Sequence, residues 1–193
     1  MPGRSSQRDK IVRATADLLR RRGYAATGLA EVIETSRAPK GSLYHYFPGG
    51  KEELATAAIA YAAERVRITL SELAATQQTP AAILRAYGVL VAGWLAQSGF
   101  RDGCPITTTA LETAPEKADL TKAARDAFAG WCGIFEERLI ASGLGPERAR
   151  RLSRLAIMAL EGALIVARVE QSGEPILSAT ADVAAMIESE SAR

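Results

Sequence analysis

The sequence predicts an all-α protein: a three-helix helix-turn-helix head, then a larger helical body, with about nine helices in all. Three observations predict this class. Apolar residues recur at helical spacing in nearly every segment, alanine is abundant, and runs of alternating β-branched residues are absent. Proline and glycine interrupt the chain without any repeat period, which indicates a bundle of separate helices.

Three short helices are expected in the first 50 residues, over about 6–23, 27–35 and 39–46. Ser6 and the aspartate three residues later form a capping-box pattern, and a glycine closes the first segment. Thr27 is the expected N-cap of the second helix. A proline suits the first turn of the third helix.

Six further helices are expected in the body, after a break at Pro48-Gly49-Gly50. Proline residues open or precede several of them, as expected for helix starts. The expected segments run over about 51–75, 80–97, 104–113, 117–142, 147–172 and from 175 to near the end of the chain.

Charge divides the chain near residue 50. The 193 residues carry a formal net charge of +2. Residues 1–50 contain nine Lys and Arg against four Asp and Glu, a balance of +5, so residues 51–193 carry −3. A basic head beside a mildly acidic body indicates that the head meets a polyanion. We therefore expect two domains, 1–50 and 51–193.

The composition excludes several function classes. Cys104 and Cys132 have no CxxC spacing, which argues against a disulfide framework or a zinc ribbon, and His45 is the single histidine. No apolar signal segment is visible, and no apolar run reaches the roughly 18–20 residues of a membrane span. We expect a soluble, cytoplasmic protein with no cofactor, no metal site and no membrane association.

Residues 27–47 read TGLAEVIETSRAPKGSLYHYF, two short helices joined by a tight turn. With Lys51-Glu52-Glu53-Leu54 after it, this stretch resembles the TetR family of transcriptional regulators. The run from Ala38 to Lys51 and the Gly103-Cys104-Pro105-Ile106 loop are similar to the LmrA and YxaF subgroup. The resemblance implies a DNA-binding head on residues 1–50 and an effector-binding, dimerising body on residues 51–193.

The resemblance places DNA contacts on and around the third helix. Two small residues let its backbone approach a groove floor, and its lysine, histidine and tyrosines donate to phosphates or base edges. Lys51 lies in the first turn of the next helix, where unpaired backbone N–H groups favour a phosphate. The expected DNA contacts are Thr27, Arg37, Lys40, Gly41, Ser42, Tyr44, His45, Tyr46 and Lys51.

Each of these positions also has a structural interpretation. Leu43 and Phe47 are expected in the core of the head rather than on DNA. Either tyrosine can pack, Thr27 can be only a cap, and the lysines and histidine can be ordinary surface residues. Arg37 occupies the turn position where the family usually has glycine in a left-handed conformation, at a cost of roughly 1 kcal/mol. We hypothesise that a phosphate contact by Arg37 compensates for this cost.

The body is expected to dimerise and to bind an effector. Two apolar helices near the C-terminus form the expected dimer interface, although they can also be buried within one chain. Its expected members are Leu155, Leu160, Leu164, Ile176, Val183 and Ile187. An aromatic cavity suits a flat, hydrophobic effector, although the same aromatics can be ordinary core. Its candidate lining is Tyr61, Trp94, Cys104, Phe128, Trp131, Phe135 and Glu161.

The resemblance therefore implies a repressor that binds a palindromic operator as a dimer and is released by a small hydrophobic effector. An activator or an architectural regulator belongs to the same class. An enzyme is the first rival, but no phosphate loop, GxSxG motif or His–carboxylate cluster is present, so no catalytic residue is expected. A helical interaction module that does not bind DNA is the second rival, and the +5 head disfavours it.

Overall fold

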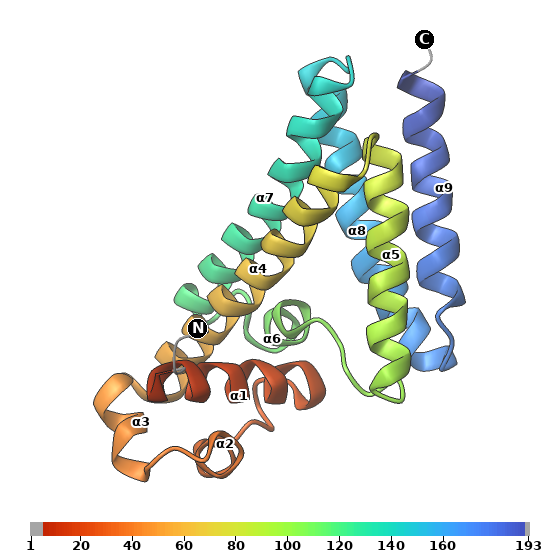
Figure 1. Cartoon of the computed structure of the whole chain (residues 1–193). Helices are drawn as coiled ribbons and strands as arrows, with labels where there is room; N and C mark the ends of the chain where they lie inside the picture. Colours follow the sequence, from red (N-terminus) through yellow and green to blue (C-terminus); the bar gives the residue numbers. More distant parts are fainter. Residues whose placement is uncertain (1–5, 192–193) are drawn as a thin grey trace. The chain divides into compact units, whose positions relative to one another are not determined.

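The computed structural model describes residues 6–191, which form nine α-helices and no strand (Figure 1). The expected all-α class is confirmed. Arg4, one of the basic residues of the head, lies outside the described residues. The helices are α1 Gln7–Arg22, α2 Leu29–Ser36, α3 Lys40–Tyr46, α4 Gly50–Thr76, α5 Pro80–Gln97, α6 Pro105–Thr113, α7 Ala118–Ala141, α8 Pro146–Glu170 and α9 Glu174–Ser191.

Local signals place most of the helix ends. The Ser6 hydroxyl accepts the Asp9 N–H and the Asp9 carboxylate accepts the Ser6 N–H, so the capping box that opens α1 is confirmed. The expected N-cap of α2 was wrong, because Gly28 occupies that position. Thr27 instead donates its hydroxyl to the carbonyl oxygen of Gly23, at 2.7 Å, within the preceding turn.

The chain divides into two compact units that interleave along the sequence. The first consists of the chain up to Glu64 together with Cys104–Ala127, and the second of Arg65–Gly103 together with Phe128 onward. Helices α4 and α7 each continue from one unit into the other. The division at residue 50 stays a prediction.

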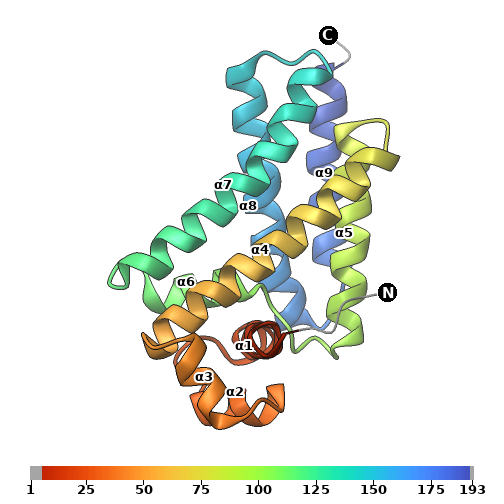
Figure 2. The ribbon, with the colours of Figure 1, turned by 60° about the vertical axis from the view of Figure 1, so that its left-hand side comes forward.

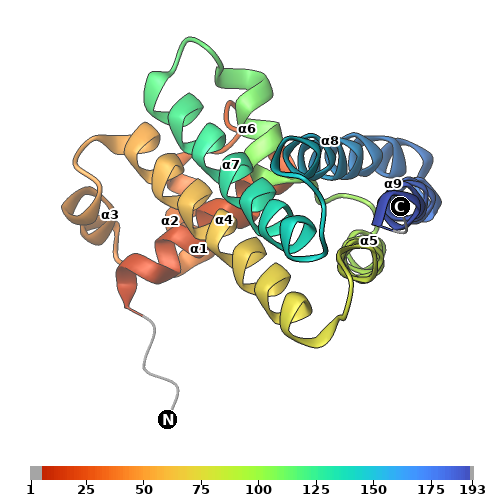
Figure 3. The same cartoon turned by 90° about the horizontal axis from the view of Figure 1, so that it is seen from above.

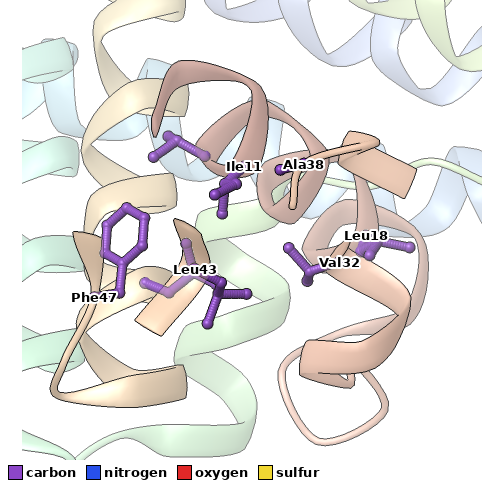
Figure 4. Packing of buried hydrophobic residues seen from close by; sticks show 8 residues of the cluster. Ile11, Leu18, Val32, Ala38, Leu43 and Phe47 are labelled. Atoms are coloured by element: carbon purple, nitrogen blue, oxygen red, sulfur yellow. The ribbon is translucent and has the colours of Figure 1, made fainter. Parts of the chain in front are cut away.

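The core of the first unit lies under α1, which packs against α2, α3 and α6. Figure 2 looks nearly along α1, with α2 and α3 beneath it. Leucine, isoleucine, valine and phenylalanine side chains from four helices or their ends meet there (Figure 4). Each large apolar side chain buried in this way contributes roughly 1.5–3 kcal/mol. The cluster contains Ile11, Val12, Leu18, Val32, Ala38, Leu43, Phe47 and Leu54.

Helices α5, α8 and α9 lie side by side in the second unit (Figure 3). Gly88 of α5 lies directly against α9, where a Cβ atom would be 2.4 Å from Oγ1 of Thr180. The missing side chain therefore allows the close approach of these two helices. Near the end of α9, Glu188 pairs with Arg85 of α5 and Glu190 pairs with Arg148 of α8.

We predict that Gly88→Ala destabilises the second unit by about 1–3 kcal/mol, because the new methyl group overlaps Thr180. Trp94 and Trp131 are the two tryptophans of the chain and both lie in this unit. Their fluorescence during urea denaturation therefore reports its unfolding.

Gly93→Ala is the matched control in the same helix. Apart from sequence neighbours and the backbone of α5 itself, no described atom lies within 4 Å of its added Cβ, so the better helix propensity of alanine stabilises α5 by up to about 1 kcal/mol. Equal urea midpoints for the two variants would show that the close approach of α5 to α9 does not contribute to the free energy of unfolding.

Candidate nucleic-acid interface

Helix α3 presents one polar face because its apolar face is buried. Leu43 is fully buried and Phe47, which caps the helix, is 1% exposed, which confirms both as core residues. The side chains between them point outward, and Tyr44 and Tyr46 are 53% and 37% exposed. Lys40, Gly41 and His45 are exposed as well, and Ser42 is half-buried.

The exposed face of α3 combines donors with an open backbone. The His45 and Tyr46 rings meet edge to face, with centroids 5.0 Å apart. Apart from its neighbours in sequence and the backbone of α3 itself, no described atom lies within 4 Å of the place where a Gly41 Cβ would be. The fold therefore does not require glycine at this position, and the missing side chain leaves room for an external surface to approach the backbone of α3.

Arg37 joins α2 to α3 in a left-handed conformation, with φ 53° and ψ 28°. This confirms that the turn needs the conformation in which glycine is usual. Its backbone N–H donates to the carbonyl oxygen of Glu34 at 3.2 Å, and its side chain is exposed. The guanidinium therefore projects from the turn that precedes α3, while a phosphate contact stays a prediction.

Thr27 lies inside the head rather than on its surface. Its side chain is 2% exposed, its hydroxyl donates to Gly23 and its backbone N–H donates to the Tyr24 carbonyl oxygen at 3.2 Å. A phosphate contact by Thr27 stays a prediction, and both hydrogen bonds count against it because the donors already have partners.

Lys51 reaches back toward the turn between α1 and α2. Its ammonium donates to the carbonyl oxygen of Ala25 at 3.1 Å and lies 4.5 Å from the centre of the Tyr24 ring. A phosphate contact by Lys51 also stays a prediction. For such a contact, the Lys51 ammonium must either leave the Ala25 carbonyl oxygen or donate to the carbonyl and the phosphate at once.

Side chains of α6 and of the segment after it also contact the turn between α1 and α2. The Glu112 carboxylate accepts the Ala25 N–H at 2.5 Å. It also lies where a Gly23 Cβ would be, since that atom would be 1.8 Å from Oε1 of Glu112. Gly23 adopts φ 79°, so the backbone conformation favours glycine, and a larger residue would also displace the Glu112 carboxylate.

Lys117 completes the anchor of this turn. Its ammonium pairs with the Glu52 carboxylate at 2.6 Å and lies 5.7 Å from the Tyr24 ring centre, so Tyr24 contacts two ammonium groups. The hydrogen bond that the Lys117 ammonium donates to the Glu52 carboxylate raises the pKa of Lys117. Glu52 and Lys117 are 65 residues apart and Ala25 and Glu112 are 87 apart, and no local sequence signal identifies either pair.

Some of the positively charged side chains of the head form ion pairs with carboxylates of the head itself. Arg22 pairs with Glu31 at 2.8 Å and Arg20 with Asp17 at 3.2 Å. Arg37 and Lys40, in contrast, lie on the exposed surface formed by the turn and α3. A polyanion therefore meets fewer positive charges than the composition of the head indicates.

The comparison with known protein families agrees with this geometry. Residues 11–58 match the model for bacterial regulatory proteins of the tetR family, and residues 80–182 match the C-terminal domain of LmrA/YxaF-like transcriptional regulators. The chain belongs to the TetR family. This match confirms the expected LmrA and YxaF subgroup. The expectation that the chain is not an enzyme is also confirmed, because the family and its relatives are transcriptional regulators.

TetR-family relatives match over nearly the whole chain. An HTH-type transcriptional regulator of Mycobacterium tuberculosis is 36% identical over 174 residues, covering 88% of each chain. The HTH-type transcriptional regulator LmrA of Bacillus subtilis is 31% identical over 170 residues, covering 88% of this chain and 90% of LmrA.

Solved structures of TetR regulators share the fold. A regulator from Chloroflexus aurantiacus superposes with a TM-score of 0.77 at 29% identity, covering 94% of both chains. One from Legionella pneumophila superposes with a TM-score of 0.82 at 18% identity, covering 97% of this chain and 98% of that one. Within residues 6–191 of the TetR-family chain, no helix is both long enough and apolar enough to span a membrane.

The effector candidates of this TetR-family chain fall in both compact units. Tyr61 and Cys104 belong to the first unit, and the other five belong to the second. Phe128 and Trp131 meet edge to face with centroids 5.5 Å apart, and Phe135 is buried one turn further along α7. Three of the candidates therefore lie on one helix, and a ring contact joins two of them, Phe128 and Trp131. Trp94 is 46% exposed and contacts Tyr87, and Glu161 is half-buried.

Most of the expected dimer residues pack inside the TetR-family chain, and their place at a dimer interface stays a prediction. Leu155 and Leu164 are half-buried, whereas Leu160, Ile176, Val183 and Ile187 are at most 6% exposed and have almost no surface to offer a partner. Helical spacing shows that a face is apolar but not which neighbour covers it. The large apolar side chains that remain exposed on α8 and α9 are Met158, Ile165, Val166, Val169, Leu177 and Met186.

We predict that Glu112→Ala speeds amide exchange at Ala25, because that N–H loses its carboxylate acceptor. The loss is about 1 kcal/mol at this exposed site, roughly a fivefold faster exchange. Hydrogen exchange resolved by NMR measures it. Glu116→Ala is the control, since it removes an exposed carboxylate four residues away. Equal exchange at Ala25 in both variants would contradict the anchor.

Proposed function

We propose that the chain is a cytoplasmic repressor that binds a palindromic operator as a dimer and is released by a small hydrophobic effector. One observation carries the DNA-binding part: burial of Leu43 and Phe47 turns the polar side chains of α3 outward on a basic head. A helix presented in this way fits the major groove, where its side chains reach base edges.

The proposed DNA contacts differ in what they read. Lys40 and Arg37 supply positive charge, which favours phosphates and fixes the position of the head on the duplex. Tyr44, His45 and Tyr46 offer donors and aromatic edges beside the open backbone at Gly41. We assign sequence preference to this second group, with Ser42 as a further donor.

Two heads are needed to select a site in a genome. The exposed apolar side chains of α8 and α9 form a surface that a second copy of the chain can cover, with Val169 78% and Met158 64% exposed. A twofold dimer then presents two α3 helices to half-sites about 34–36 Å apart.

The proposed effector site includes the aromatic residues of α7. Phe128, Trp131 and Phe135 supply a mostly apolar lining, which suits a flat hydrophobic molecule. Repression is relieved if the effector prefers a conformation in which the heads no longer match the half-sites. Effector and operator then lower each other's affinity by the same factor.

We predict that Arg37→Asn weakens binding to duplex DNA and lowers the slope of log affinity against log salt by about 0.9 for each lost phosphate contact. Asparagine tolerates the left-handed backbone, so the change removes the charge without adding strain. Fluorescence anisotropy at several salt concentrations measures both quantities.

Arg125→Asn provides the control, since it removes one exposed positive charge from α7. We expect a smaller loss of affinity from this variant and an unchanged slope. The contact assigned to Arg37 would have to be abandoned if the two variants behaved alike.

We predict that Val169→Arg converts the dimer to a monomer, because it places a charge in the apolar surface of α8. Light scattering at micromolar concentration measures the mass. Leu111→Arg changes a leucine of α6 that is 75% exposed and serves as the control. A dimer that persists in Val169→Arg, or a monomeric wild type, would rule out this interface.

A further inference from the structure

A cleft of about 300 Å³ opens between the first half of α1 and the part of α4 that belongs to the same compact unit. Its floor is apolar. Val12 is 4% exposed, and Ala57 and Tyr61 pack against the core of the head. Ala60 also lines the cleft, and its small side chain leaves the space above the floor open. The volume lies at the lower end of the range for small-molecule sites, about 300–1,000 Å³.

Two arginines of α1 line this cleft, and each has an aromatic partner. The Arg8 guanidinium carbon lies 5.3 Å from the centre of the Phe47 ring, and the Arg13 guanidinium carbon lies 5.8 Å from the centre of the Tyr61 ring. A ring contact of this kind holds the face of a guanidinium and leaves N–H donors at its edge. Within residues 6–191, neither group forms an ion pair.

Asp9 is the carboxylate on the wall of the same cleft. It accepts the Ser6 N–H in the capping box, and its hydrogen bonds with Ser6 hold its pKa below the usual range, so it is ionised at neutral pH. Two guanidinium groups and one carboxylate give the lining a net charge of +1. An occupant with a single negative charge balances this lining.

We propose that the α1–α4 cleft binds a small organic acid, a monocarboxylate with a flat or short apolar body. The carboxylate lies between Arg8 and Arg13, and the apolar body covers Val12, Ala57 and Tyr61. A DNA phosphodiester fits less well, because it has no apolar group to cover the floor. Tyr61 is then a ligand residue of the first compact unit, whereas Phe128, Trp131 and Phe135 belong to the second. This site does not depend on the proposed function.

The test uses 3-phenylpropanoate and its neutral amide, 3-phenylpropanamide, with the full-length protein. NMR titration follows the backbone amides of residues 8–13 and 57–61 and the Nε–H groups of Arg8 and Arg13. We expect saturable shifts at these groups with the acid, and about tenfold weaker binding of the amide, which lacks the charge-assisted hydrogen bonds.

Three variants locate the site. Arg8→Gln and Arg13→Gln each weaken binding of the acid about tenfold and leave the amide unchanged. Ala60→Trp fills the cleft and abolishes binding of both molecules, and circular dichroism checks that each variant is folded. Arg125→Gln is the control, with one charge removed from α7 and unchanged binding.

Four outcomes would overturn the proposal. They are no binding of the acid, equal affinities for the acid and the amide, unchanged affinities in folded Arg8→Gln and Arg13→Gln, or shifts confined to residues 128–135. The last outcome would assign acid binding to the aromatic residues of α7 instead of to the α1–α4 cleft.

Discussion

Leu43 and Phe47 lie one turn apart at the end of α3, and the burial of both side chains fixes which face of this short helix points outward. A helix of seven residues is not stable by itself, since isolated helices need about 12–15 residues. Its order therefore comes from the contact with α1. The exposure of Tyr44 and His45 follows from the same contact, as does the position of Arg8 over the Phe47 ring.

Several charged side chains of the first unit contact the turn between α1 and α2 instead of pointing freely into solvent. Glu112 holds the Ala25 N–H, while Lys51 and Lys117 contact the Tyr24 ring from the start of α4 and from the segment before α7. A lysine that anchors a turn has fewer protons to offer a phosphate. We therefore assign the DNA-facing charge of the proposed interface to Arg37 and Lys40, which are exposed.

Local chemistry made much of this structure predictable. The capping box at Ser6, the proline that opens α5, the left-handed turn at Arg37 and the buried pair on α3 all depend on neighbouring residues, and all were confirmed. Pro39, expected in the first turn of α3, is instead its N-cap. The expected N-cap at Thr27 was wrong although its partner is local, whereas burial on α8 and α9 depends on distant partners. The polar pattern at Thr27 indicates a cap, yet its hydroxyl is buried in the preceding turn. The apolar faces of α8 and α9 are visible in the sequence, but the residues that other helices cover are not.

The left-handed backbone at Arg37 restricts any redesign of DNA preference in this head. A side chain in this conformation costs roughly 1–2 kcal/mol, least for asparagine and aspartate, and glycine escapes the cost. Lys40, Tyr44 and His45 carry no such requirement, because they lie on the outer face of a regular helix. A combinatorial library can therefore vary these three positions widely, whereas position 37 accepts only a small set of residues before the turn itself begins to fail.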